Sequence, residues 1–402
     1  MSRWPKLALN EPLVVIFAAI GLDAVGIGLI FPILPRLIAE VTHAGNVAPY
    51  IGIMTALYAV MQFIFAPVLG ALSDRLGRRP VLLISLAGAA INYLVMAFAP
   101  RLWMLLIGRA IAGLTSANIS VATAYITDIS PEETRAGRFG LFNAMFGIGF
   151  IVGPVLGGVL GDYWLRLPFI AAAVLNAGNL LLALFILPES RVPSRERVDL
   201  AALNPLRPLR WVFSMKRLIP VTTVFFILSA TGEVYGTCWA LWGNDVFRWN
   251  GLWIGLSLGA FGVCQALAQA LLPGPAVKLL GERGTILTGI AGACAALVVL
   301  AFATRGWVVF AIMPVFVLGG IGTPALQSLA TRLVDESRQG QFQGVLASAV
   351  SLASIVGPLA SSTFYFVVRE RWPGAIWLLV VGVQAIAVPL VLGLRFRTGD
   401  AA

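Results

Sequence analysis

Twelve long apolar segments divide this sequence, and they constrain its fold more than any other feature. Only 11% of the residues are charged and 59% are hydrophobic, whereas a soluble domain carries about 25% charged residues. A helix that crosses a membrane needs about 20 mostly apolar residues. The sequence therefore predicts an all-α polytopic membrane protein with twelve transmembrane helices, at 13–35, 50–72, 80–99, 102–126, 139–160, 167–187, 218–242, 253–273, 285–304, 307–329, 342–366 and 374–394.

The distribution of Lys and Arg predicts the orientation of these helices. If the loops alternate between the two sides of the membrane, 20 of the 28 basic residues share the side of the N-terminus and seven lie on the other, while Arg109 falls inside a span. Cytoplasmic loops are the ones enriched in Lys and Arg. We therefore expect both termini and the basic segment 188–217 to be cytoplasmic. The net charge of +10 then reflects topology and does not indicate nucleic-acid binding.

The sequence repeats itself at an offset of 204 residues. The tetrapeptide Ile151–Pro154 recurs as Ile355–Pro358, and Gly77, in the loop after the second span, matches Gly281 in the loop after the eighth. Two matches at one offset predict two pseudo-symmetric halves of six helices in parallel repeat. We assign the halves to 1–187 and 218–402, joined by a cytoplasmic linker at 188–217.

Several motifs place this architecture in a known family. Gly70–Arg79 resembles the signature loop of the major facilitator superfamily, and Gly149–Gly158 resembles the fifth-helix motif of its antiporters. Leu22–Ile30, Ser85–Ala90 and Leu300–Trp307 are similar to segments of the tetracycline/proton antiporters. The resemblance covers nearly the whole chain. It implies the major facilitator fold, a multi-pass location in the bacterial inner (plasma) membrane, and drug efflux coupled to protons.

Three charged residues lie well inside the predicted spans. Asp23 is ten residues past Leu13, about 15 Å along a helix at 1.5 Å per residue. A carboxylate in hydrocarbon costs at least ~2.5 kcal/mol, so we expect Asp23 to couple proton movement to transport, unless polar groups at a helix break near Gly26 hold it. Glu233 is the second proton-coupling candidate and could instead neutralise a cationic substrate, unless it lies near an interface. Arg109 matches a family motif whose arginine is implicated in proton transfer, and it could instead donate to carbonyls of the first helix.

The chain departs from the tetracycline exporters at three positions. Asn92 stands where their third helix carries an aspartate, Ala293 stands where their ninth carries another, and Arg248 replaces a histidine. An amide can hydrogen-bond a ligand but takes up no proton near neutral pH. The departures therefore concentrate proton coupling on Asp23 and Glu233, and they argue against a tetracycline–metal substrate.

Polar and aromatic side chains inside the spans are candidates for substrate contact. Amphipathic ligands bind where apolar walls surround a few polar groups. Each side chain is equally explained by hydrogen bonding between helices or by packing. The predicted substrate-binding residues are Asn92, Gln62, Tyr93, Asn118, Tyr235, Trp239, Gln265 and Gln327.

The loop after the second span is interpreted as a gate. Gly70 allows a close helix approach, Gly77 allows a tight turn, and Asp74 is placed to meet the N-terminal end of the eleventh span. Its arginines also obey the positive-inside rule, so the loop could serve orientation alone. The predicted gating residues are Gly70, Asp74, Arg75, Gly77, Arg78, Arg79 and Asp128, with Arg78 or Arg75 pairing with Asp128.

The fifth span carries a face of small residues and a helix-bending proline. We interpret this face as a packing and hinge surface between the halves. The predicted hinge residues are Gly149, Gly153, Pro154, Gly157 and Gly158.

The sequence offers little support for an enzyme. It contains no G-x-x-x-x-G-K-[ST] loop for nucleotide hydrolysis and no cluster of His and Cys for a metal centre, since His43 is the only histidine. We expect a monomeric antiporter that exports amphipathic drugs by alternating access. Its partners are the small substrate, protons and the lipid bilayer, and its energy source is the proton gradient without any cofactor. The alternative is an exporter or facilitator of an endogenous metabolite on the same fold.

Overall fold

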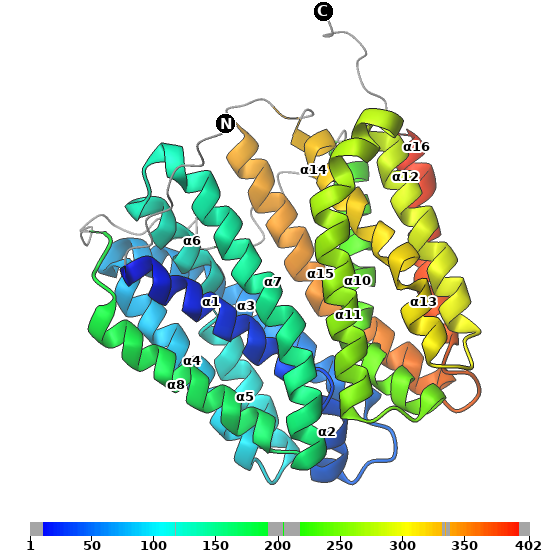
Figure 1. Ribbon diagram of the computed structural model, residues 1–402, viewed down its shortest axis with the longest axis horizontal. Coiled ribbons are helices and arrows are strands. Elements are labelled where there is room, and N and C mark those ends of the chain that lie inside the picture. The colour runs from blue at the N-terminus through cyan, green and yellow to red at the C-terminus, as the bar shows by residue number, and fades with distance from the viewer. Residues whose placement is uncertain are drawn as a thin grey trace, which may run out of the picture. The chain divides into compact units, whose positions relative to one another are not determined.

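The chain folds into long helices that pack side by side within each of two units (Figure 1). The computed structural model describes residues 11–116, 118–191, 204, 218–331, 334 and 338–393. Within these ranges every element is helical, and twelve helical segments are long and apolar enough to cross a membrane. The all-α class and the number of spans predicted from the sequence are confirmed. Both chain ends and nearly all of the predicted linker, namely 192–203 and 205–217, lie outside the described residues.

The helices of the first six spans mostly begin and end within about four residues of the predicted limits, although that of the fifth span begins seven residues before residue 139 and that of the first ends five residues before residue 35. They are α1 (Glu11–Ile30), α3 (Ala48–Leu76), α4 (Arg78–Phe98), α5 (Leu102–Leu114) with α6 (Asn118–Ile129), α7 (Glu132–Tyr163) and α8 (Leu167–Ile186), with α2 (Leu34–Thr42) after the first. The last six are α10 (Ile219–Phe247), α11 (Gly251–Leu271), α12 (Pro273–Ala301), α13 (Trp307–Phe316) with α14 (Gly322–Thr331), α15 (Gln339–Val368) and α16 (Ala375–Gly393).

The first span ends earlier than the sequence predicts. Its helix stops at Ile30, and the separate helix α2 starts at Leu34, where we expected one span to continue to residue 35. Pro32 has no backbone N–H and disfavours helix in the residue before it. Pro35 suits the first turn of a new helix, where that N–H is not needed. Two prolines three residues apart thus replace the last turn of α1 with a corner.

The fourth and tenth spans are interrupted at equivalent positions. In the fourth span α5 ends at Leu114 and α6 begins at Asn118; in the tenth a 3-10 turn over Val317–Ile321 precedes α14, which begins at Gly322. Asn118 and Gly322 are separated by 204 residues, the offset of the sequence repeat. The interruption was not predicted, because each apolar segment is continuous in sequence. Its recurrence supports the parallel repeat.

The two loop glycines of the repeat adopt related backbone conformations. Gly77 has φ of 103° and Gly281 has φ of 69°, and they are the glycines with positive φ among the described residues. An L-residue with a side chain adopts such angles only with strain. The tight turn predicted at Gly77 is confirmed, and its counterpart at Gly281 changes the chain direction inside the long segment α12.

Contacts group the chain into two compact units. Unit 1 comprises Met1–Pro205 with Trp249–Gly262, and unit 2 comprises Leu206–Arg248 with Val263–Ala402. The start of α11 therefore belongs with the first unit, although the sequence repeat assigns it to the second half. In unit 1, α1 packs mainly on α7 and α4 on α8; in unit 2, α10 packs on α15 and α12 on α16. These are the same pairs of spans in each repeat.

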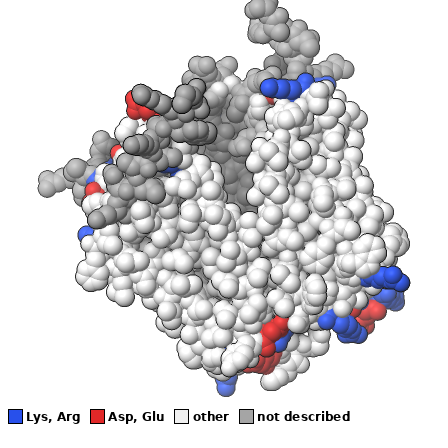
Figure 2. Space-filling view, in the orientation of Figure 1, with Lys and Arg blue, Asp and Glu red and all other residues white. Residues whose placement is uncertain are grey.

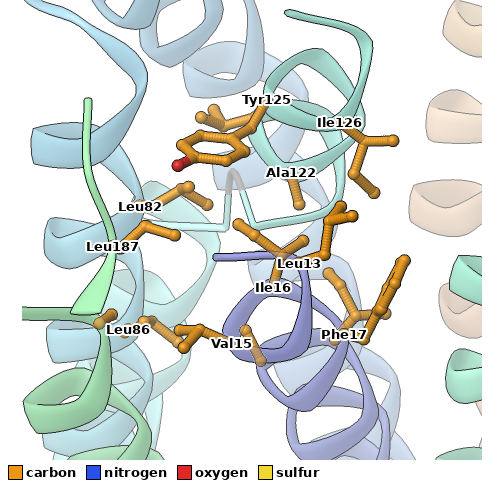
Figure 3. Close-up of a cluster of buried hydrophobic side chains, with 14 of the residues drawn as sticks. Leu13, Val15, Ile16, Phe17, Leu82, Leu86, Ala122, Tyr125, Ile126 and Leu187 are labelled. Atoms are coloured by element: carbon orange, nitrogen blue, oxygen red, sulfur yellow. The ribbon is translucent and has the colours of Figure 1, made fainter. Parts of the chain in front are cut away.

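Apolar side chains fill the inside of each unit. In unit 1, Leu13 of α1, Leu82 of α4 and Tyr125 of α6 meet in a buried cluster (Figure 3). In unit 2, Val221 of α10 and Phe342 of α15 belong to a similar cluster, and both are fully buried. Burial of such side chains from water is worth roughly 25 cal/mol per Å², but lipid is as apolar as they are, so close packing holds these helices together.

On the visible surface, the charged side chains gather near the helix ends (Figure 2). On the face shown in Figure 2, Lys, Arg, Asp and Glu gather near the ends, and the sides between them are white. This distribution fits helices whose middle sections are embedded in hydrocarbon.

Candidate functional site

Asp23 of α1 lies near polar side chains of three other helices in unit 1. It interacts electrostatically with the phenols of Tyr58 on α3 and Tyr93 on α4. Both phenols also interact with the guanidinium of Arg109 on α5. The acid and the arginine therefore share both tyrosines as electrostatic neighbours. The structure brings together three residues that the sequence singled out separately, the proton-coupling candidates Asp23 and Arg109 and the substrate-binding candidate Tyr93, and it adds Tyr58 to them.

Small residues make this arrangement possible. A Cβ added at Gly26 would lie 2.5 Å from the phenol oxygen of Tyr93, so glycine there leaves room for that ring beside α1. A Cβ at Gly113 would lie 2.7 Å from Cβ of Met61, on the helix that carries Tyr58. Tyr58 also shares a hydrogen bond with Ser116, which lies in the interruption between α5 and α6. The break in the fourth span thus supplies a polar partner to the site.

Two polar groups next to the site are buried without a partner among the described residues. They are Nε of Arg109 and Oδ1 of Asn92. Asn92 is 3% exposed and lies against α5, where a Cβ added at Gly108 would be 3.2 Å from its Oδ1. A buried polar atom without a hydrogen bond costs free energy. Asn92 therefore retains capacity for a further hydrogen bond, and its role in binding substrate stays a prediction.

Glu233 is a half-buried residue of α10 in unit 2, and it lies where α10 packs against α15. The Ser354 hydroxyl donates a 2.5 Å hydrogen bond to its Oε1. A Cβ added at Gly357, one turn further along α15, would lie 3.0 Å from Cβ of Glu233 and 2.8 Å from the carbonyl oxygen of Ala230. The repeated tetrapeptide in the eleventh span thus lets α15 approach the helix that carries this acid.

Tyr235 and Trp239 belong to a stack of aromatic rings inside unit 2. The Tyr235 ring lies 4.8 Å from that of Phe316 and 5.6 Å from that of Trp377, measured between centroids. The Trp239 ring stacks on Phe316 at 6.3 Å, and Trp239 is 2% exposed. The rings pack on one another, which matches the packing interpretation for these residues. Their contact with a substrate stays a prediction.

The other predicted substrate contacts are spread over several helices. Gln62 on α3 and Gln265 on α11 are half-buried, and Gln327 on α14 is exposed. Gln265 lies over Gly320, in the interruption of the tenth span, where any side chain would collide with its amide. Asn118 begins α6, and its side chain lies outside the described part of the chain.

Arg78 is the centre of the charged network after the second span. Its Nε donates to Asp128 Oδ2 at 3.1 Å, its Nη1 to Ser73 Oγ at 2.7 Å, and its Nη2 pairs with Asp74 Oδ1 at 2.7 Å. The predicted pairing of Arg78 with Asp128 is therefore present. The side chain is 8% exposed, so these bonds hold a largely buried charge. They fix the start of α4 to the ends of α3 and α6.

The remaining gating candidates behave differently from one another. Asp74 has a second arginine partner in Arg191, at 2.8 Å, and Arg79 donates to the Leu184 carbonyl at 2.6 Å. Arg75 is exposed. The close approach expected at Gly70 is wrong for the described residues, because a Cβ there would have no described neighbour within 4 Å. The predicted contact of Asp74 with the start of the eleventh span, and gating itself, stay predictions.

Sequence reasoning missed Glu189. Its carboxylate accepts hydrogen bonds from the backbone N–H groups of Arg78, at 2.7 Å, and Arg79, at 3.1 Å. Backbone N–H groups at a helix start are unpaired and carry partial positive charge. The carboxylate thus caps α4 from a point about 110 residues away in the sequence, and only an acidic residue at the start of the linker could have indicated it.

We expect Arg78→Gln to destabilise the protein, because it leaves Asp74 and Asp128 without their shared guanidinium. Hydrogen bonds to charged groups contribute about 1.5–3 kcal/mol each, so the melting temperature of the detergent-purified protein should fall by several degrees. Arg75→Gln is the matched control, since Arg75 is exposed on the same loop. Equal melting temperatures for the two variants would show that the network contributes nothing to stability.

The fifth-span glycines mainly face α1. A Cβ added at Gly149 would lie 2.8 Å from Cβ of Ala24, and one added at Gly153 would lie 2.6 Å from the Val25 carbonyl oxygen. A Cβ added at Gly157 would lie 2.8 Å from Cα of Leu29. These contacts lie within the first half, where we expected a surface between halves.

Gly158 and Pro154 face a different neighbour. A Cβ at Gly158 would lie 3.0 Å from the backbone nitrogen of Leu252, and Gly255 lies against the Pro154 carbonyl. Both contacts join α7 to the start of α11, which lies in the predicted second half but groups with unit 1, so here the glycine face does pack against the other half. The packing role is present on two sides of α7, and the hinge role stays a prediction.

Two further acids at helix ends were missed by the sequence interpretation. Asp162 at the end of α7 accepts hydrogen bonds from the backbone N–H groups of Gly251, at 3.0 Å, and Leu252, at 2.9 Å, and pairs with Arg36 at 2.5 Å. Asp245 accepts two hydrogen bonds from Arg369, at 3.0 and 2.8 Å. No pattern local to either acid identifies its partner. In the described residues no group of three or more His, Cys, Asp or Glu side chains could hold a metal ion.

Comparison with known proteins identifies the family of this chain. A family profile of the Major Facilitator Superfamily matches residues 16–256 and 244–401. The class C tetracycline resistance protein of Escherichia coli is 49% identical over 380 residues, which cover 94% of this chain and 96% of that protein. The class G protein of Vibrio anguillarum is 43% identical over 95% of this chain and 98% of its own length.

Solved structures share the fold at low sequence identity. The nucleoside transporter NupG superposes with a TM-score of 0.79 at 13% identity, covering 96% of this chain and 98% of its own. The human organic anion transporter MFSD10 (TETRAN) does so with a TM-score of 0.68 at 23% identity, covering 95% and 99%. With twelve spans, a six-plus-six repeat and a full-length family match, this chain belongs to the Major Facilitator Superfamily.

Proposed function

We propose that this protein exports tetracycline-class drugs, or amphipathic molecules of similar shape, in exchange for protons. The observation that carries the proposal is the group of Asp23, Tyr58, Tyr93 and Arg109, in which an acid within a span lies among phenols and a guanidinium. Tetracycline resistance proteins up to 49% identical over 94% of the chain support the drug class. Ionisable side chains inside spans are rare and mark ion or substrate pathways.

The proposed cycle assigns the proton to Asp23 or Glu233. With substrate bound from the cytoplasm or inner leaflet, the carrier opens outward; a proton then reaches one of these acids, substrate leaves, and the protonated carrier returns. Arg109 stabilises the ionised form of Asp23 through the two tyrosines and takes part in proton transfer. Neither a cofactor nor a resident metal is required, since the proton gradient supplies the energy.

The proposed function also includes the oligomeric state, the membrane and the orientation of the protein. We propose that the protein works as a monomer in the bacterial inner membrane, with both termini and the linker in the cytoplasm. The excess of Lys and Arg in the loops assigned to that side supports the orientation. The charged network around Arg78 lies in one of those loops and forms part of a cytoplasmic gate, with α7 as the element that bends.

Inverted membrane vesicles test the proposal directly. Vesicles containing the protein should accumulate tetracycline when their interior is acidified, and collapse of the pH gradient by an ionophore should release it. Accumulation follows because protons leaving the vesicle drive drug inward. Vesicles from cells without the protein are the control. Tetracycline uptake that ignores the gradient would contradict proton coupling.

A second candidate is export of an endogenous metabolite by the same fold. Asn92 and Ala293 favour it, since they stand where the tetracycline exporters carry carboxylates, and the substrate site then differs from theirs. The same vesicles, exposed to a panel of drugs and cell extract components, decide between the candidates. Gradient-driven uptake of a metabolite with none of tetracycline would favour the second.

A further inference from the structure

We propose that Ser354 is a positioning residue for Glu233, whose hydroxyl partners the carboxyl group in both protonation states and sets the pH at which the acid exchanges its proton. The inference rests on the proposed function, in which Glu233 is one of two proton carriers. It goes further by naming the group that controls one of them. The two residues are 121 positions apart, so the sequence alone gives no indication of the pair.

The pair is held by the packing of α10 against α15. Ser354 Oγ lies 2.5 Å from Glu233 Oε1, and both side chains are half-buried. Ser354 precedes Gly357 by three residues, so the two lie on the same face of α15. At Gly357 the helices are so close that a Cβ would lie 2.8 Å from the carbonyl oxygen of Ala230. The close packing of α10 and α15 therefore holds the Ser354 hydroxyl next to the Glu233 carboxyl group.

Among the described residues, Glu233 forms no ion pair with a charged side chain. The nearest ionisable side chains on its own helix are Tyr235 and Cys238, and α15 contributes Tyr365. The described parts of α14 and α16, which also pack on α10, contain none. Asp245, three turns further along α10, is engaged by Arg369. Ser354 is thus the polar group best placed to influence the proton affinity of Glu233.

A hydroxyl suits an acid that gains and loses a proton. It donates to the carboxylate when Glu233 is ionised, and it can accept from the carboxylic acid when Glu233 is protonated. Hydrogen bonds to charged groups are the stronger of the two kinds. Removal of the hydroxyl therefore penalises the ionised state more than the neutral one, and a higher pH is needed to remove the proton.

The experiment measures initial rates of tetracycline uptake into inverted vesicles over a range of external pH. We expect Ser354→Ala to raise the pH midpoint by ~1 unit, which corresponds to about 1.4 kcal/mol, and Ser354→Thr to restore the original midpoint. Ser351→Ala is the matched control, because the Ser351 hydroxyl lies one turn away on α15 and donates to the Ala347 carbonyl of its own helix. Immunoblots of the vesicles establish that each variant is present in equal amount.

Glu233→Gln separates failure of the inference from failure of the proposed function. In one outcome, Glu233→Gln changes the pH profile, while Ser354→Ala and Ser351→Ala both leave it unchanged. Glu233 then carries a proton but Ser354 does not position it, so the inference fails and the proposed function stands. A normal pH profile in Glu233→Gln removes Glu233 from coupling, and the inference fails with that role. In the double variant Ser354→Ala/Glu233→Gln, the profile should match that of Glu233→Gln, since the hydroxyl then has no carboxyl to act on.

Discussion

Asp23→Asn is expected to reduce gradient-driven tetracycline uptake to the background of vesicles without the protein. Asparagine keeps the size and hydrogen-bonding capacity of the side chain but exchanges no proton near neutral pH. The phenols of Tyr58 and Tyr93 would then face a neutral amide, and the carrier would lose one site of charge alternation. Tetracycline binding, measured by equilibrium dialysis on the purified protein, should remain detectable.

The control for this prediction is Glu370→Gln. Glu370 is an exposed acid in the turn after α15, so its neutralisation should leave uptake unchanged. Together the two variants distinguish a specific acid from a general loss of negative charge. Uphill accumulation of tetracycline by Asp23→Asn at the rate of the unmodified protein would remove Asp23 from the coupling role and leave Glu233 as the remaining acid.

Gly153→Val should have the largest effect on folding. The added Cβ would lie 2.6 Å from the Val25 carbonyl oxygen and 2.9 Å from Cα of Gly28, and both are backbone atoms that cannot rotate away. Overpacking of a close helix pair typically costs 1–3 kcal/mol or more, so about 3 kcal/mol is expected here. The α1–α7 contact also positions Asp23, so the yield of folded protein and the uptake rate should fall together. Size-exclusion chromatography in detergent measures the folded fraction.

Gly147→Val is the matched control on the same helix. A Cβ at Gly147 would have no described neighbour within 4 Å, so the substitution there changes helix propensity and bulk without a collision. Its folded yield should stay near that of the unmodified protein. If both valines are tolerated equally, α1 and α7 are free to separate and close glycine packing is not what holds them.

The features that the sequence predicts correctly depend mainly on residues that lie close together in the chain. Span number follows from continuous apolar stretches, and the turn at Gly77 follows from a glycine between basic residues. The repeat required only a comparison of the chain with itself, and the glycine that it matched to Gly77, Gly281, also has a positive φ. Arg78 and Asp128 could be paired because both lie at helix ends assigned to the same side of the membrane.

The features that the sequence does not predict depend on which helices meet. Glu189 caps α4, Asp162 caps α11, and Ser354 meets Glu233, each across 89 to 121 positions. Hydrophobic patterning says little about such pairs, because a helix surrounded by lipid and protein is apolar on nearly every side. The corner at Pro32 and the interruption near Ser116 were missed for the same reason: the segments remain apolar where the backbone changes direction.

The interruptions in the fourth and tenth spans give the two repeats a shared mechanical property. A regular α-helix tilts as one rod, whereas a helix whose α-helical hydrogen bonding is interrupted near its middle bends more easily at that point. Because the joint occurs at the same register in both copies, a bend that is possible in one is geometrically possible in the other. Each six-helix repeat therefore carries an interruption at the same place in its fourth helix.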